Sequence, residues 1–218
     1  MELELELKDK AISISAKRGS GKSELTKYII NLFRDDFQKI YVICPSEGVN
    51  HFYSTFIPKE NIFQKYEEKW CMKLMDKMEK INCNLTKDKR VNVLLVLDDC
   101  CSDVKFHQSD SLKRIFTRGR HCNLAVIIIS QYIYQVPPVC RSNADYILVS
   151  QMNRQGVDIL TSEYLMGNIS KDDFMKMYYR NTSNYGFLLI SNSSASDNNN
   201  LDEIYGNITV PKEFFFKK

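Results

Sequence analysis

The chain has no apolar run long enough to cross a membrane, and its first residues lack a secretory signal. Among its 218 residues, the longest strongly apolar stretches are Val93–Leu97 and Leu124–Ile129. A spanning helix needs roughly 20 such residues. Residues 1–7 alternate acidic and apolar side chains, whereas a secretory signal joins a basic segment to an apolar block. We therefore expect a soluble protein with no membrane partner.

Cysteine and histidine lack the spacing of a disulfide framework or a metal site. The seven cysteines are odd in number and form no C-x-x-C pair, and several lie in apolar segments, where a thiol behaves as a small hydrophobe. The three histidines are scattered along the chain. We expect a reducing compartment and no structural metal.

The charge imbalance is small, and the composition is that of a globular protein. A net charge of +3 permits contact with nucleic acid without requiring it. Hydrophobic residues at 44% and charged residues at 26% exclude a disordered, collagen-like or coiled-coil chain. The length fits one compact domain, and neither an internal repeat nor a linker interrupts it. We expect one domain over 1–218, with a polar loop at 191–200 and a C-terminal tail at 201–218.

Short apolar runs alternate with stretches of helical periodicity, which predicts an α/β fold with a mainly parallel sheet. The predicted strands are Ala11–Ser15, Lys39–Cys44, Val91–Leu97, Asn123–Ile129, Tyr146–Val149 and Tyr185–Ile190. Helices are predicted over Lys22–Phe33, from Gln64 to about Ile81, and over Lys105–Arg118, while Pro137 and Pro138 are placed in a loop.

The segment between the first strand and the first helix is similar to a phosphate-binding loop. In the pattern G-x-x-x-x-G-K-[ST], backbone N–H groups at a helix N-terminus surround phosphate oxygens, the lysine reaches the β- and γ-phosphates, and the hydroxyl binds Mg²⁺. Gly21, Lys22 and Ser23 fill the last three positions, while Ala16 replaces the first glycine. The predicted nucleotide-binding residues are Gly19, Ser20, Gly21, Lys22 and Ser23. The alternative interpretation is a chance Gly-Ser-Gly turn before a helix.

Two further strands end in polar residues of the kind that such a loop needs. The apolar run Val93–Leu97 continues into Asp98 and Asp99, which is the form of a Walker B element, so Asp98 is the predicted Mg²⁺ ligand and Asp99 the residue that orients water. Ser130 and Gln131 follow the strand Asn123–Ile129. If that strand lies between the other two, Gln131 faces the γ-phosphate and acts as a sensor. Otherwise the two acids are turn residues and Gln131 caps a loop.

These motifs together resemble the FtsK/HerA superfamily of P-loop ATPases, and within it the DNA-packaging branch of poxviruses, other large DNA viruses and virophage-like relatives. The resemblance covers most of the chain and rests on Gly19–Ser23, Leu97-Asp98-Asp99, Gly119-Arg120-His121, Ser130-Gln131 and the segment from Pro137 to Asp145. The sequence departs from the pattern at Ala16 and at Asp99, where bacterial members carry Glu.

The resemblance implies a RecA/ASCE-like P-loop NTPase fold with helices on both faces of the sheet, and an ATP- and Mg²⁺-dependent activity. It implies a homo-oligomeric ring, a pentamer or hexamer, that moves double-stranded DNA into a capsid. Such a protein works in the host-cell cytoplasm or virus factory, in contact with the assembling virion and a capsid protein. The ring needs an arginine from a neighbouring subunit, for which Arg120 is the first candidate and Arg141 the second, ahead of Arg118 and Arg154.

The DNA-contacting residues and the class of activity stay open at this point. Lys105, Lys113, Arg114 and Arg118 form a basic patch, which is more typical of a solvated helix face than of a DNA site. Two other functions are compatible with the phosphate loop, namely a small-molecule kinase and a non-catalytic, nucleotide-dependent scaffold. A kinase usually carries a basic lid and lacks the Ser-Gln pair, and a scaffold leaves Asp99 and Gln131 without a task.

Overall fold

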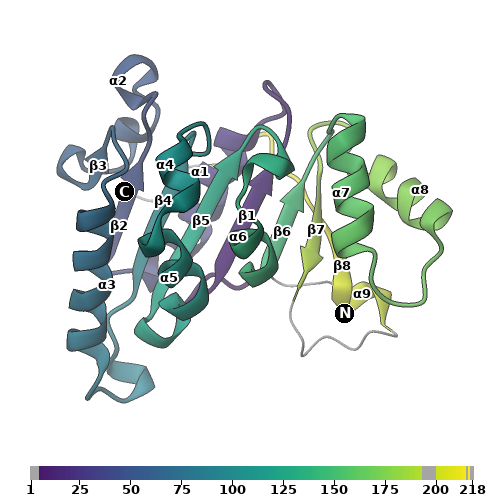
Figure 1. Cartoon of the computed structure of the whole chain (residues 1–218). Coiled ribbons are helices and arrows are strands. Elements are labelled where there is room, and N and C mark those ends of the chain that lie inside the picture. The colour runs from purple at the N-terminus through teal and green to yellow at the C-terminus, as the bar shows by residue number, and fades with distance from the viewer. Residues whose placement is uncertain (1–4, 193–199, 215, 217–218) are drawn as a thin grey trace.

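The computed structural model describes residues 5–192, 200–214 and 216, and within these ranges eight strands form one sheet (Figure 1). The strand order is β3-β2-β4-β5-β1-β6-β7-β8. Neighbouring strands from β3 to β6 run parallel, whereas β7 is antiparallel to both β6 and β8. The strands are β1 Ala11–Ser15, β2 Lys39–Ile43, β3 Ile62–Phe63, β4 Val93–Asp98, β5 Leu124–Ser130, β6 Tyr146–Val149, β7 Phe187–Ser191 and β8 Tyr205–Ile208. The predicted α/β class with a mainly parallel sheet is confirmed.

Helices cover both faces of this sheet, as predicted (Figure 1). Along β4, Val93, Leu95 and Leu97 belong to one hydrophobic core, and Leu94 and Val96 belong to the other. The first core includes apolar side chains of α3, α5, α6, α7 and α8, and the second includes those of α1. The helices are α1 Lys22–Phe33, α2 Glu47–Asn50, α3 Glu68–Asn82, α4 Val104–Gln108, α5 Asp110–Arg118, α6 Pro138–Asn143, α7 Arg154–Tyr164, α8 Lys171–Asn181 and α9 Leu201–Ile204.

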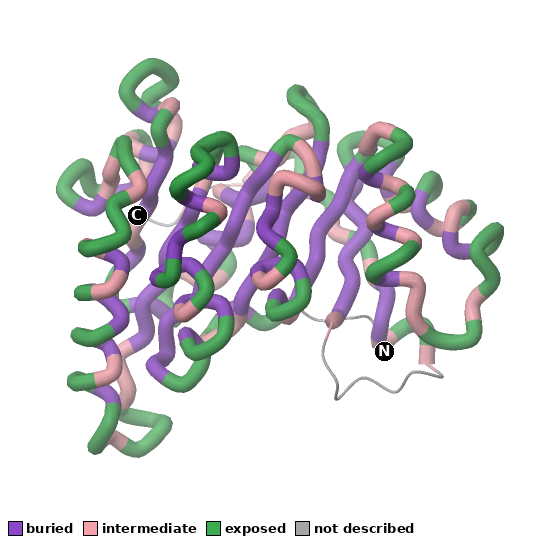
Figure 2. The backbone as a smooth tube through the Cα atoms, in the orientation of Figure 1, coloured by how far each residue is buried: buried purple, intermediate pink, exposed green. Residues whose placement is uncertain are grey.

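The central strands form where the sequence is apolar on both faces. Parallel strands buried between two helical layers have continuous apolar runs instead of alternating ones, and β4 and β5 are buried along almost their whole length (Figure 2). The six predicted strands are all present, with ends that differ by no more than two residues from the predicted ones. The central strands therefore follow directly from hydrophobicity.

Three predicted helical or loop segments differ from the structure. The segment Lys105–Arg118, predicted as one helix, is divided into α4 and α5. The division falls at Ser109, whose extended backbone and side-chain oxygen, which accepts from the Leu112 N–H, form an N-cap. Helix α3 begins at Glu68 instead of Gln64, and Pro138, predicted in a loop, is the first residue of α6. Proline is suited to that position because the first helical N–H needs no partner within the helix.

The C-terminal part of the chain contributes more to the fold than a tail does. Residues 201–208, expected within the tail, form α9 and β8, and β8 pairs with β7. Of the loop expected at 191–200, Ser191 belongs to β7 and Asn200 caps α9, while residues 193–199 lie outside the described residues. Among the described helices, none combines the length and apolar character that crossing a bilayer requires.

Candidate functional site

The order of the strands brings the three predicted motifs to one edge of the sheet. Strand β5 lies between β1 and β4, and Ser15 is in register with Ser130 while Asp98 is in register with Ile129. Because all three strands are parallel, their carboxyl ends meet at one edge, which is where α/β sheets bind ligands. Strand β5, which Gln131 follows, thus lies between the other two, which is the condition under which Gln131 is expected to face the γ-phosphate.

The loop from β1 to α1 has the backbone that its glycines allow. Gly19 and Gly21 have φ angles of 79° and 86°, in the left-handed region that glycine adopts without steric cost. Gly21 is the N-cap of α1, so the first N–H groups of that helix face the end of the loop. Ala16 does not have a positive φ, its side chain is fully buried, and its N–H donates to the Ser130 carbonyl. Alanine therefore fits this position without backbone strain.

Lys22 is folded onto the loop that precedes it. Its ammonium group donates hydrogen bonds to the carbonyl oxygens of Ala16 and Lys17. Burial lowers the pKa of this ammonium, while the charges of Asp98 and Asp99 oppose that effect. The lysine is thus positioned above the loop, and its charge faces the two acids at the end of β4.

The two acids at the end of β4 have different environments. Asp98 accepts a hydrogen bond of 2.8 Å from the Tyr53 hydroxyl, and burial raises the pKa of its carboxyl to about 6, although that hydrogen bond acts in the opposite direction. Asp99 is exposed and has a left-handed backbone with φ of 57°. Aspartate tolerates this conformation better than most residues, so Asp99 both turns the chain away from β4 and presents its carboxylate to solvent.

Tyr53 and Glu47 belong to this site, although no sequence motif identified them. The Glu47 carboxylate is buried and accepts the backbone N–H groups of Tyr53 at 2.9 Å and Ser54 at 2.8 Å. These bonds fix the buried Tyr53 side chain, whose hydroxyl reaches Asp98. The segment around Tyr53 shows neither helical nor strand periodicity, so its contact with Asp98 depends on the folded chain and has no signal in the sequence.

Most of the predicted site residues line one cavity, the main cavity. Its volume of about 500 Å³ is typical of small-molecule sites. Of the predicted site residues, Gly19, Gly21, Lys22, Ser23, Asp98, Asp99 and Gln131 line it. The remaining lining residues are Arg18, Glu24, Ser46, Asn50, Ile129 and Ser130. Ser20 is not among them, and its hydroxyl donates to the Lys17 carbonyl within the loop. The loop, the acids and the glutamine are thus brought together around one space.

The amino-acid sequence that forms this cavity and this strand order also matches a known protein family. The profile of the poxvirus A32 protein matches residues 3–203. The chain belongs to the poxvirus A32 protein family. This A32-family chain is 29% identical to uncharacterized protein 075L of Invertebrate iridescent virus 6 over 196 residues, which make up 89% of this chain and 75% of that protein. It is 26% identical to uncharacterized protein 088R of Invertebrate iridescent virus 3 over 190 residues, with shares of 85% and 70%.

Solved structures show the same fold. The genome packaging NTPase B204 from Sulfolobus turreted icosahedral virus 2, in complex with AMPPCP, matches with a TM-score of 0.61 and 20% identity over 86% of this chain and 95% of that one. The pCW3 conjugation coupling protein TcpA, with bound ATPgS, matches with a TM-score of 0.56 and 15% identity over 71% of this chain and 52% of that one. The resemblance of the A32-family chain to viral packaging ATPases is therefore confirmed, and the fold is that of a P-loop NTPase.

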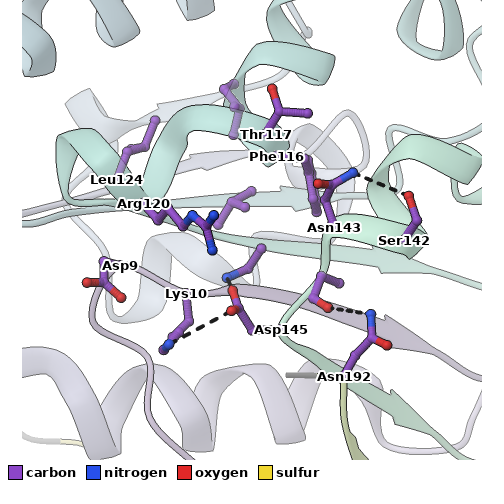
Figure 3. A pocket seen from close by; sticks show the side chains of 14 residues that line it. Asp9, Lys10, Phe116, Thr117, Arg120, Leu124, Ser142, Asn143, Asp145 and Asn192 are labelled. Carbon is purple, nitrogen blue, oxygen red and sulfur yellow. Dashed lines mark hydrogen bonds and ion pairs between the residues drawn. The ribbon is translucent and has the colours of Figure 1, made fainter. Parts of the chain in front are cut away.

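Arg120 lies away from this cavity, at the opposite edge of the sheet. It belongs to a short 3-10 helix, Gly119–Cys122, and its side chain is exposed. Together with Ala11, the first residue of β1, it lines a second cavity of about 210 Å³, and Figure 3 shows its guanidinium group pointing toward Lys10 and Asp145. Arg120 therefore cannot reach the phosphate loop of its own subunit.

Arg141 has a structural role in the A32-family fold. Its guanidinium group donates to both carboxylate oxygens of Glu163, at 2.8 and 2.6 Å, and to the Val136 carbonyl at 2.7 Å. The side chain is mostly buried, so these bonds hold α6 and α7 together. Arg118 and Arg154 are exposed. Arg141, the second candidate for the arginine supplied to a neighbouring subunit, is thus already bound within its own subunit.

The predicted basic patch on α4 and α5 is partly neutralised. Arg114 bonds to Asp76 at 2.7 Å and Glu79 at 2.8 Å, both on α3, and Lys113 pairs with Asp110 at 2.9 Å. The Arg114 pairs join α5 to α3, whereas the Lys113 pair lies within α5 on its exposed face. The arrangement favours the interpretation of this patch as a solvated helix face.

The donor atoms of the main cavity fit Mg²⁺ only together with a phosphate ligand. Ser23 and Asp98 offer a hydroxyl and a carboxylate oxygen, which are ligands that Mg²⁺ accepts. In the described part of the chain, no group of three or more His, Cys, Asp or Glu side chains is arranged to hold a metal ion. Phosphate oxygens and water would complete the octahedral shell, as in other nucleotide sites where Mg²⁺ is bound through few protein ligands.

Proposed function

We propose that this A32-family protein is an ATP-hydrolysing motor that packages double-stranded DNA into a viral capsid, with residues 1–218 acting as one ATPase domain. The observation that carries the proposal is the single cavity lined by Lys22 and Ser23 of the loop and by Asp98, Asp99 and Gln131 at the ends of the neighbouring strands. The similarity in fold to B204, described as a genome packaging NTPase, supports it.

The five residues that carry the proposal each have a task in phosphoryl transfer to water. Lys22 would exchange the carbonyls of Ala16 and Lys17 for β- and γ-phosphate oxygens, placing a cation where negative charge develops. Ser23 and Asp98 would hold Mg²⁺, which, when bound, neutralises phosphate charge. Asp99 is exposed to solvent and would orient the attacking water, and Gln131 at the end of β5 would sense the γ-phosphate.

The position of Arg120 supports a ring in which neighbouring subunits share each site. Arg120 lies at the edge of the sheet opposite to the phosphate loop, so a head-to-tail contact between copies would bring it to a neighbour's nucleotide. Head-to-tail contacts close into a ring when the rotation between successive copies allows closure. The ring, a pentamer or hexamer, would enclose duplex DNA and work in the host-cell cytoplasm or virus factory, against a capsid protein of the assembling virion.

Stimulation by DNA distinguishes the motor from a small-molecule kinase and from a scaffold. We expect phosphate release from ATP to increase several-fold when long double-stranded DNA is added, because a translocating motor couples turnover to its track. The measurement compares duplex DNA with heparin at equal charge, which controls for a general effect of polyanions. Turnover that is indifferent to DNA, or transfer of the γ-phosphate to a small acceptor, would contradict the proposal.

A further inference from the structure

Tyr185 places an aromatic ring in solvent beside the phosphate loop. It lies in the connection between α8 and β7, and 71% of its surface is exposed. Its Cδ1 atom is 3.9 Å from where a β-carbon on Gly21 would stand, so the ring borders the N-cap of α1. It is not among the residues that line the main cavity. The ring is therefore a neighbour of the loop, just outside the space that the loop shares with the acids.

The backbone around Tyr185 is held in an unfavourable conformation. Asn184 and Tyr185 both have left-handed backbones, with φ angles of 51° and 61°, and this region is a genuine outlier for a bulky residue. The Gly186 N–H donates to the Ser183 carbonyl at 2.9 Å, and the Ser150 hydroxyl donates to the Gly186 carbonyl at 2.9 Å. Backbone strain that the surrounding structure maintains tends to occur at ligand sites. The Tyr185 ring is exposed, so packing of the ring in the core does not explain the strain.

The strand order gives the direction in which a bound nucleotide extends. Asp98 and Gln131 follow β4 and β5, on one side of β1, and they fix where the terminal phosphate and its metal would lie. Tyr185 precedes β7, which is two strands from β1 on the other side. A triphosphate gripped around Gly21 with its terminal end at the acids therefore directs its nucleoside away from them, toward β6 and β7.

We propose that the Tyr185 ring is the stacking platform for the nucleobase of the bound nucleotide. The inference rests on the proposed function, because it takes ATP as the ligand of the main cavity. A tyrosine face is suited to this task, since every base has a π-face that stacks on it. The two hydrogen bonds at Gly186 restrain the backbone next to Tyr185, so less backbone freedom is lost when a base binds to the ring.

The test compares ATP with inorganic tripolyphosphate, which carries the phosphates without a base. Tyr185→Asn removes the ring, and asparagine tolerates a left-handed backbone, so the loop keeps its shape. We expect this variant to bind ATP roughly tenfold more weakly in calorimetric titrations with Mg²⁺, from the loss of one base-stacking contact. Its affinity for tripolyphosphate should equal that of the unmodified protein, and Tyr185→Phe should bind both ligands normally.

Tyr179 offers a matched control. It is a tyrosine on α8 with 63% exposure, and Tyr179→Asn should leave both affinities unchanged. If Tyr185→Asn binds ATP as well as the unmodified protein does, or if both ligands weaken equally, the stacking role is overturned. If the unmodified protein binds tripolyphosphate but does not prefer ATP, the inference also fails. If it binds neither ligand, the proposed function fails instead, so the two failures are distinguishable.

Discussion

Lys22→Ala is expected to lower ATP turnover by at least about 10²–10³-fold, the cost of removing one preorganised charged donor from a phosphoryl or oxyanion site. In the structure the Lys22 ammonium donates hydrogen bonds to the carbonyl oxygens of Ala16 and Lys17 in the loop. The two hydrophobic cores do not include it. Thermal unfolding should therefore be nearly unchanged, while phosphate release and DNA movement disappear.

Lys17→Ala is the matched control for this variant. Lys17 belongs to the same loop, and its side chain is exposed. The hydrogen bond from Lys22 goes to the Lys17 backbone carbonyl, which an alanine at this position retains. The variant should retain turnover within a few-fold of the unmodified protein. Hydrolysis by purified Lys22→Ala at the unmodified rate would show that the loop does not hold the reacting phosphates.

Arg120→Ala is expected to reduce turnover of the assembled ring by about 10³–10⁵-fold, the range found for arginine fingers in related NTPases. Arg120 lies at the sheet edge opposite to its own phosphate loop. It can therefore contribute to hydrolysis only at the site of a neighbouring subunit. Its side chain is exposed, so the variant should fold normally. Phosphate release at protein concentrations that support the ring is the measurement.

Mixing two inactive variants shows whether Arg120 acts on a neighbour. A subunit with Arg120→Ala keeps its loop, and a subunit with Lys22→Ala keeps its arginine, so a mixed ring contains some complete sites. Part of the activity should return on mixing, whereas neither variant is active alone. Full-speed hydrolysis by a dilute monomer of the unmodified protein would contradict a shared site. Arg154→Ala, at a lower-ranked candidate that is also exposed, should leave turnover intact if Arg120 is the shared residue.

The central strands and the phosphate loop could be predicted from the sequence because they depend on local composition. The run Val93–Leu97 is apolar on both faces, which is typical of a parallel strand buried between two helical layers. Strand β8 has no such signal, since its residues include Gly206 and an exposed Asn207, and it forms because β7 offers an unpaired edge. The break at Ser109 was missed because the helical periodicity continues across it, although the serine caps α5.

Some residues of the candidate site could likewise be predicted from the sequence, and others could not. Lys22, Asp98 and Gln131 are recognisable because each has a fixed place relative to a strand end. Tyr53 has no such place, and its contact with Asp98 depends on the folded segment whose backbone bonds to the buried Glu47 carboxylate. Tyr185 likewise comes to the loop through strand order, 164 positions after Gly21 in sequence number. Residues that act through tertiary contacts leave no pattern that spacing could detect.

A crystal structure of the protein with Mg²⁺ and a non-hydrolysable ATP analogue tests the central claim most directly. The account predicts the triphosphate in the cavity between Gly19–Ser23 and Asp98, with Lys22 moved from the Ala16 and Lys17 carbonyls onto phosphate oxygens. The metal should lie within reach of Ser23 and Asp98. An analogue bound anywhere else, with Lys22 still on its loop carbonyls, would contradict the account.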